Sequence, residues 1–404
     1  MSGPGLGVVA ASAKATARVV WPALLIGGSL YVMAIDLLHM PGGRRPGQMW
    51  AGVDFHTYLA AALVGLQHGW AEIYDQGLIR AVQGQLNPQQ FTQPYLSPPA
   101  DSWLALPLVD LPYALAFAIW ASIVVAALAL AFGWTSAYRG PARVAAVAVA
   151  MTPWWVLLAV YVGQVVPLVA AAVLVTWRLV KSNREIAAGL VLSLLALKPN
   201  TAILVPLVLL VTGRWRAFVA WAAGSVALAA LSLLVIGPEG VTDYVYSLGH
   251  LPGGGTALTL GGAFGVSGIT ATVVRAAIVV TAVGAAFMLR TRPGVGMAVG
   301  VLGSLLISPY LHNSDLCLFV VAGWMVWQEA PLWRAALVAM LLAASPYLLA
   351  RDLGPSLQGW VRIELAFMLG LAATAVITRG VAGRVTDEEG ALTPRAEFGR
   401  RAPA

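Results

Sequence analysis

Charged residues are scarce in this chain of 404 residues: only 10% are Asp, Glu, Lys or Arg, whereas 59% are hydrophobic. Soluble globular domains carry roughly 25% charged residues. This shortage excludes a water-soluble enzyme, a disordered chain and a nucleic-acid-binding module. The net charge of +7 does not restore the nucleic-acid interpretation, because the basic residues lie between apolar runs. We therefore expect membrane lipids around the chain and no nucleic-acid partner.

Cysteine is nearly absent, since Cys317 is the single one. One cysteine excludes a disulfide framework and any metal cluster built from cysteines. The sequence also has no internal repeat of fixed period, which weakens the case for a transporter built from duplicated halves. No glycine-rich strand-to-helix fingerprint of a nucleotide site is found either.

Long apolar runs dominate what is present. A bilayer core of about 30 Å requires about 20 mostly apolar residues per helix. A scan for such runs gives about twelve candidate segments, several of them short: 19–38, 103–134, 144–160, 165–180, 186–197, 201–211, 218–236, 269–289, 295–307, 316–327, 335–349 and 365–377. The sequence thus predicts an all-α integral membrane protein with a multi-pass domain over residues 1–378. The first segment is expected to be an uncleaved signal anchor.

The basic residues indicate an orientation. When the N-terminus is placed in the cytoplasm, most Lys and Arg residues fall on that side, and only Arg44, Arg45, Arg80, Arg351 and Arg362 fall on the opposite side. Cytoplasmic loops are enriched in Lys and Arg. Both termini are therefore expected in the cytoplasm, and residues 379–404 are expected to form a flexible tail.

Two long loops are then predicted on the outer side, at residues 39–102 and 237–268. All five histidines and most acidic residues outside the tail map to that side. Long loops in compact proteins are often functional. We therefore expect the chemistry at the outer membrane face.

Asp54 begins a helical run in the first outer loop. Tyr58, Ala62 and Gly65 follow it at helical spacing, which predicts a short amphipathic helix on the membrane surface. Asp54 then has two interpretations: it caps the helix N-terminus, or it is a catalytic carboxylate held at the membrane surface.

Lys198 lies between two apolar runs, where a lysine costs about 2.5–3.5 kcal/mol on insertion scales. It either extends to the interface or binds an anion, and a phosphate is favoured because no carboxylate is adjacent. His312 and Asp315 lie in another outer break between spans, and Gly163-Gln164 form a tight outer turn.

Taken together, these motifs resemble glycosyltransferase family 87, a GT-C class family that uses sugars carried on polyprenyl phosphate. The resemblance covers roughly residues 15–380. Its elements are Asp54-Phe55-His56-Thr57-Tyr58, Pro94-Tyr95-Leu96-Ser97-Pro98-Pro99, Gly163-Gln164, Leu197-Lys198-Pro199, and Ser308-Pro309 with His312 and Asp315.

The resemblance implies a GT-C fold and an inverting α-mannosyltransferase of the bacterial plasma membrane. Its donor would be polyprenyl-phosphate-mannose, and its acceptor a glycolipid such as a phosphatidylinositol mannoside. It also implies Asp54 as the general base and Lys198 and His312 as ligands of the donor phosphate, with no metal and no cofactor. The candidate residues of the substrate pocket are His56, Tyr58, Tyr95, Gln164 and Asp315.

Other functions remain open from the sequence. An arabinofuranosyltransferase that uses polyprenyl-phosphate-arabinose would have the same fold. In a lipid or solute transporter, Lys198 and Arg275 would line a path through the membrane. A non-catalytic membrane subunit would need no outer carboxylate.

Overall fold

The computed structural model describes residues 4–40, 50–250, 256–345 and 355–392, which contain helices and no strand. The α-helices are α1 (Pro4–Leu38), α2 (Val53–Gln67), α3 (Gln76–Leu86), α4 (Pro99–Ala105), α5 (Tyr113–Thr135), α6 (Gly140–Met151), α7 (Trp154–Tyr161), α8 (Val166–Lys181), α9 (Glu185–Leu192), α10 (Leu204–Val211), α11 (Trp215–His250), α12 (Leu260–Phe264), α13 (Gly268–Met288), α14 (Pro293–Ile307), α15 (Cys317–Glu329), α16 (Arg334–Ala343) and α17 (Leu357–Leu392). Short 3-10 helices are η1 (Trp70–Tyr74), η2 (Leu106–Leu108), η3 (Ser193–Leu197), η4 (Pro199–Thr201), η5 (Asn313–Leu316) and η6 (Pro331–Trp333).

Every apolar run predicted from the sequence overlaps a helix, but the helices differ in length. Within the described residues, five helices are long and apolar enough to cross a membrane, namely those containing Arg18–Leu38, Tyr113–Thr135, Trp215–His250, Gly268–Met288 and Leu357–Arg379. The pair α6 and α7, bent by 74°, makes a sixth if it counts as one span. The other runs form shorter helices, and α14 is buried at almost every position. Of these shorter helices, α8, α14 and α15 are buried at most of their positions.

Large apolar side chains are exposed along the long helices. Leu24 on α1, Leu234 on α11 and Val280 on α13 each expose 70% or more of their surface. An apolar surface of this extent marks contact with a membrane or a partner. Together with the long apolar helices, it indicates a multi-pass membrane protein.

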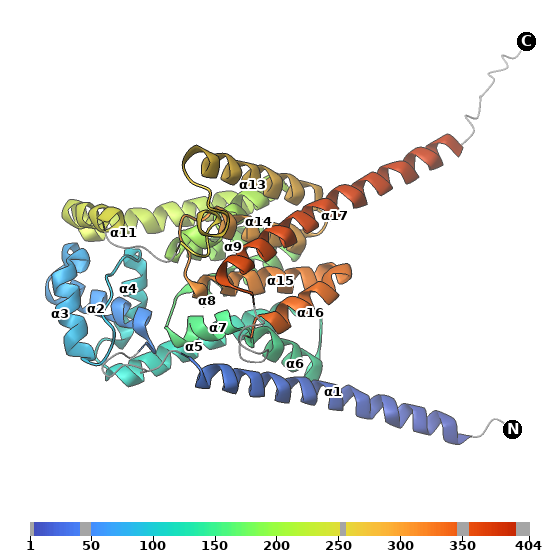
Figure 1. Ribbon diagram of the computed structural model, residues 1–404, viewed down its shortest axis with the longest axis horizontal. Helices are drawn as coiled ribbons and strands as arrows, with labels where there is room; N and C mark the ends of the chain where they lie inside the picture. Colours follow the sequence, from blue (N-terminus) through green and yellow to red (C-terminus); the bar gives the residue numbers. More distant parts are fainter. Residues whose placement is uncertain (1–3, 41–49, 251–255, 346–354, 393–404) are drawn as a thin grey trace, which may run out of the picture.

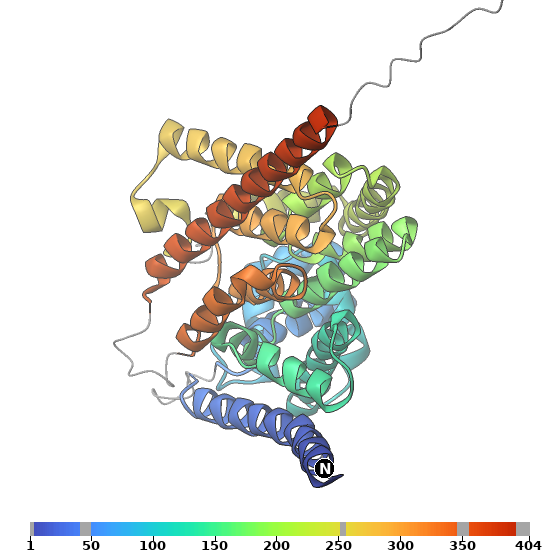
Figure 2. The ribbon, with the colours of Figure 1, turned by 90° about the vertical axis from the view of Figure 1, so that its right-hand side faces the viewer.

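The helices are arranged with α2, α3 and α4 gathered at one end of the molecule (Figure 1). The helix α1 begins and α17 ends at the opposite end, and Figure 2 looks along the molecule from that side. Residues of the long loop 39–102 thus fold into a helical layer at the end remote from both termini. This layer carries Asp54.

A kink in α11 brings its second half over this layer. Gly237 has φ 66° and ψ −179°, a conformation that only glycine adopts readily, and Pro238 follows it. After the kink, Tyr244 stacks on Tyr74 of η1 at 4.5 Å between ring centroids. The chain also passes so close to η1 that a Cβ at Gly240 would lie 3.0 Å from the Ala71 carbonyl oxygen.

The prediction that the run after Asp54 forms an amphipathic helix on the membrane surface is wrong. The helix α2 is buried at most of its positions, on the face of His56 as well as on that of Phe55 and Leu59. A surface helix requires a solvated polar face, and α2 has too few polar residues to form one. The amphipathic helix of this loop is α3, where Ile79, Val82 and Gln83 are buried and most other positions are not.

Candidate active site

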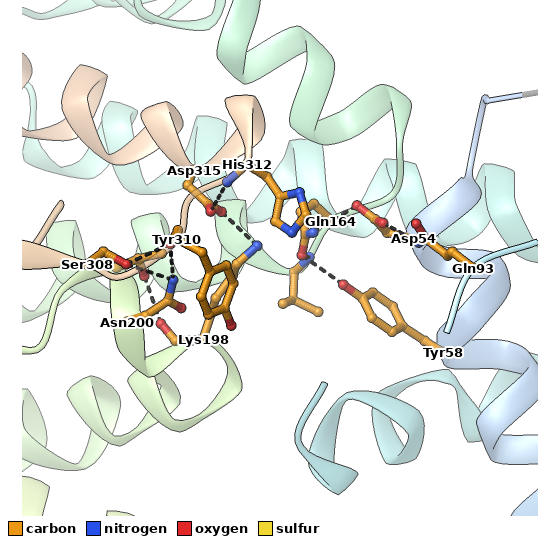
Figure 3. A network of polar contacts seen from close by, with 12 residues as sticks. Asp54, Tyr58, Gln93, Gln164, Lys198, Asn200, Ser308, Tyr310, His312 and Asp315 are labelled. Carbon is orange, nitrogen blue, oxygen red and sulfur yellow. Dashed lines mark hydrogen bonds and ion pairs between the residues drawn. The ribbon is translucent and has the colours of Figure 1, made fainter. Parts of the chain in front are cut away.

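Asp54 lies in the first turn of α2 and does not cap it. The N-cap is Gly52, which has a left-handed φ of 76° and no capping side chain. The N-cap interpretation of Asp54 is therefore wrong. Instead, Asp54 Oδ1 accepts a hydrogen bond from Gln93 Nε2 at 2.5 Å, and Oδ2 accepts one from Gln164 Nε2 at 2.8 Å (Figure 3).

Gln164 reaches Asp54 from the turn between α7 and α8. Its Oε1 accepts hydrogen bonds from the Tyr58 hydroxyl at 2.7 Å and from the backbone N–H of Val165 at 3.1 Å. These two donors fix the amide so that its NH₂ group faces the carboxylate. The structure thus brings together Asp54, Tyr58 and Gln164, three of the residues named as candidates from the sequence.

Glycine is required immediately before Gln164. Gly163 has φ 75°, and a Cβ there would lie 2.6 Å from the Cβ of Phe55. The close approach of this turn to α2 therefore leaves no room for a side chain. The Gly163 carbonyl also accepts a hydrogen bond from Trp120 Nε1 at 2.9 Å, which anchors the turn to α5.

Gln93 is a site residue that the sequence reasoning missed. Besides Asp54, its Nε2 lies 3.2 Å from both the Val53 carbonyl oxygen and the Thr57 hydroxyl. Gln83 holds the Gln93 backbone through two hydrogen bonds, of 2.8 and 3.1 Å. The only sequence signal was its position directly before the proline-rich turn, which does not distinguish a ligand from a loop residue.

A second polar group comes from two other elements. Lys198 Nζ lies 2.7 Å from Asp315 Oδ1, and Asp315 Oδ2 accepts a hydrogen bond from the His312 backbone N–H at 2.8 Å. Asp315 is fully buried and Lys198 is 9% exposed. The expectation that Lys198 has no carboxylate beside it is wrong, because a sequence does not reveal a partner so distant along the chain.

Asn200 and Ser308 connect the two chain segments that carry the Lys198–Asp315 ion pair. Asn200 Nδ2 donates to Ser308 Oγ and to the Tyr310 carbonyl oxygen, each at 3.3 Å. Ser308 Oγ in turn donates to the same carbonyl at 2.7 Å. These bonds fix the segment after Lys198 against the segment before His312.

The two groups face each other across the site. Figure 3 shows the His312 imidazole turned toward the Gln164 and Asp54 side. Burial raises the pKa of Asp54 above its ordinary value, while the Gln93 hydrogen bond and the charges of Lys198 and His312 oppose this rise. The arrangement therefore combines a carboxylate of raised basicity with two groups able to bind an anion.

His56 and Tyr95 do not join this network. The ring nitrogen His56 Nε2 lies 3.0 Å from the Gln83 carbonyl oxygen, and burial lowers the pKa of this fully buried histidine to about 4. The Tyr95 hydroxyl donates to the Pro98 carbonyl at 2.7 Å, and its ring stacks on Tyr74. Both side chains hold the loop together, and their predicted contact with substrate gains no support from these positions.

The described side chains offer no evident metal site. Within the residues that the structure describes, no group of three or more His, Cys, Asp or Glu side chains is placed to hold a metal ion. Independence from metal stays a prediction.

Comparison with known protein families identifies a related family. The model of the family described as "Glycosyltransferase family 87" matches residues 95–309. The matched part contains Gln164, Lys198 and Ser308 and ends shortly before His312. No curated protein and no solved structure matches the chain.

Proposed function

The chain belongs to glycosyltransferase family 87, and we propose that it transfers mannose from polyprenyl-phosphate-mannose to a hydroxyl of a glycolipid such as a phosphatidylinositol mannoside. The proposal includes a GT-C fold with about twelve membrane-crossing segments. It places the site at the outer face of the bacterial plasma membrane and both termini in the cytoplasm.

The observation that carries this proposal is the environment of Asp54. Two amide donors orient the carboxylate, and its pKa is raised by burial. In the proposed reaction, Asp54 takes the proton of the acceptor hydroxyl as that oxygen attacks the anomeric carbon. The bond from this carbon to the phosphate oxygen breaks, its electron pair stays on the phosphate, and the β linkage becomes α. General-base assistance contributes typically about 10²–10⁴-fold.

Lys198 and His312 are proposed to bind the departing phosphate. Asp315 holds both residues, one through its ion pair and the other through the backbone N–H. Positive groups fixed before the reaction stabilise developing negative charge without further reorganisation. Their position opposite Asp54 supports a sugar bound between the base and the phosphate.

An apolar cavity supports a lipid-linked substrate. It measures about 410 Å³ and lies between α1, α6, α7, α15 and α16. Trp155 at the start of α7 and Phe319 on α15 line it. Because α7 leads from this cavity to the turn that carries Gln164, a lipid chain in the cavity would lie near the polar site.

The test is a transfer assay with the purified full chain in detergent, labelled polyprenyl-phosphate-mannose and a phosphatidylinositol mannoside. We expect wild type to form a mannosylated glycolipid and Asp54→Asn to lose activity by at least about 10²-fold, because the base is removed. The matched control is Asp243→Asn, an exposed carboxylate on the second half of α11, which should retain wild-type activity.

Near-normal turnover by Asp54→Asn would exclude this residue as the base. Product formed only when the donor carries arabinose would move the assignment to an arabinofuranosyltransferase.

A further inference from the structure

Asp101 on α4 is a buried carboxyl group that the proposed reaction does not use. The residue is 1% exposed. In the part of the chain that the structure describes, neither carboxyl oxygen has a partner within hydrogen-bond geometry, although the Ser97 side chain lies close by. An unpaired buried polar group costs free energy, and its persistence requires an explanation such as a ligand.

The surroundings of Asp101 connect it to both halves of the site. The helix α4 packs against α2, which carries Asp54, and against α11. Asp101 is close enough to Tyr58 to raise the pKa of its hydroxyl, and Lys198 is close enough to lower the pKa of Asp101. Asp101 therefore lies within electrostatic range of the Tyr58 side of the Asp54 network and of the lysine proposed to bind phosphate.

The protonation state of Asp101 limits the ligands that it suits. Burial raises the pKa of Asp101 well above its ordinary value, more than Lys198 and the nearby Ser97 side chain lower it. A protonated carboxyl group offers one O–H donor and retained acceptor capacity. This combination suits a neutral hydroxyl group, which also both donates and accepts, better than it suits a cation or a phosphate.

We propose that Asp101 binds a hydroxyl group of the transferred sugar and so takes part in the choice of donor. This inference rests on the proposed function, in which the sugar lies between the phosphate at Lys198 and the base at Asp54. Asp101, on a helix packed against α2 and within electrostatic range of Lys198 and of Tyr58, is a candidate to contact a sugar in that position. The two unpartnered oxygens are then satisfied by the sugar when the donor binds.

The experiment compares two lipids that differ only in the sugar. Binding of polyprenyl-phosphate-mannose and of bare polyprenyl phosphate is measured by calorimetry on the full chain carrying Asp54→Asn, so that no turnover occurs. Adding Asp101→Ala should weaken binding of the mannosyl lipid about fivefold to tenfold, a loss typical of one hydrogen bond. Binding of the bare lipid should not change.

Two further variants separate a ligand role from a structural one. Asp101→Asn keeps a donor and an acceptor and should restore affinity for the mannosyl lipid to within about twofold. Ser102→Ala is the matched control, because this buried neighbour on α4 donates to the Pro99 carbonyl, at 2.7 Å, within its own turn. It should leave the binding of both lipids unchanged.

The outcomes separate the two proposals. If Asp101→Ala weakens the binding of both lipids equally, or if Asp101→Asn fails to restore the affinity for the mannosyl lipid, Asp101 only supports α4 and the inference is overturned. If the parent protein binds neither lipid, the proposed function itself fails, and the role of Asp101 fails with it.

Discussion

Asp54 shows how single hydrogen bonds set the chemistry of this site. The Gln93 amide donates to its carboxylate and lowers the pKa of Asp54, against the larger effect of burial. A hydrogen bond to the charged form of an acid favours that form. Removing the Gln93 donor should therefore raise the pKa of Asp54 further.

This shift is testable by the pH dependence of transfer. In Gln93→Leu, the acid limb of kcat/KM should move to higher pH, because the base becomes protonated at a higher pH than in wild type, and kcat at neutral pH should fall about tenfold. The measurement is a pH profile with a saturating acceptor. Gln85→Leu, at an exposed position of α3, serves as the control, and an acid limb that does not move in Gln93→Leu would disprove the role of Gln93.

At this scale, the sequence indicated part of the site. Asp54, Tyr58, Gln164, Lys198, His312 and Asp315 were all singled out, and the structure brings them into one region. Their pairing was not predictable, since Lys198 meets Asp315 only after several helices have packed. Gln93 and Asp101 were not chosen as site residues from the sequence. Gln93 matters because it donates to Asp54, and Asp101 because its buried oxygens lack a partner, and only the folded structure shows either fact.

At the scale of the helices, breaks in the apolar runs determine where helices end and bend. Each apolar run of the sequence overlaps a helix, because apolar runs form helices in a membrane. The sequence did not give their lengths, since Pro153 separates α6 from α7 at a sharp bend and Gly237 kinks α11. It also misplaced α2, whose alanines at positions 60 to 62 allow close packing on all sides.

The kink at Gly237 makes a clear prediction. Gly237→Ala should lower the free energy of unfolding by about 1–3 kcal/mol, because its backbone conformation suits only glycine. Space does not limit the substitution, as no atom lies within 4 Å of the added Cβ. The measurement is thermal unfolding of the purified protein in detergent.

Gly249→Ala is the matched control in the same helix. It also has open space around its Cβ but no positive φ, so it should be neutral or slightly stabilising. Equal stability of the two variants would show that the kink is not held by the glycine.

For the whole molecule, the main feature is the separation of the α2–α4 layer from the end at which α1 begins and α17 ends (Figure 1). The helix α8 begins beside Gln164 and runs for 16 residues to Lys181, a rise of roughly 24 Å. The residues immediately after α8, such as Ser182, are therefore far from the site, and in the proposed topology they lie on the cytoplasmic side.

Cysteine labelling tests this topology. Cys317 is fully buried, so the wild-type chain should react little with a maleimide that does not cross membranes. In intact cells, Gln89→Cys, at an exposed position after α3, should be labelled. Ser182→Cys, exposed after α8, should be labelled only once the membrane is opened. The reverse pattern would place the candidate site on the cytoplasmic side.

The ion pair between Lys198 and Asp315 affects which anions bind to the site when no donor is present. An empty site with an unpaired lysine would attract any small anion from the surroundings. Here an abundant free phosphate must compete with a carboxylate that already occupies Lys198 at 2.7 Å. The full donor also gains affinity from its sugar and its lipid chain, so it displaces the carboxylate more readily than free phosphate does. The ion pair therefore weakens the binding of small anions more than the binding of the donor.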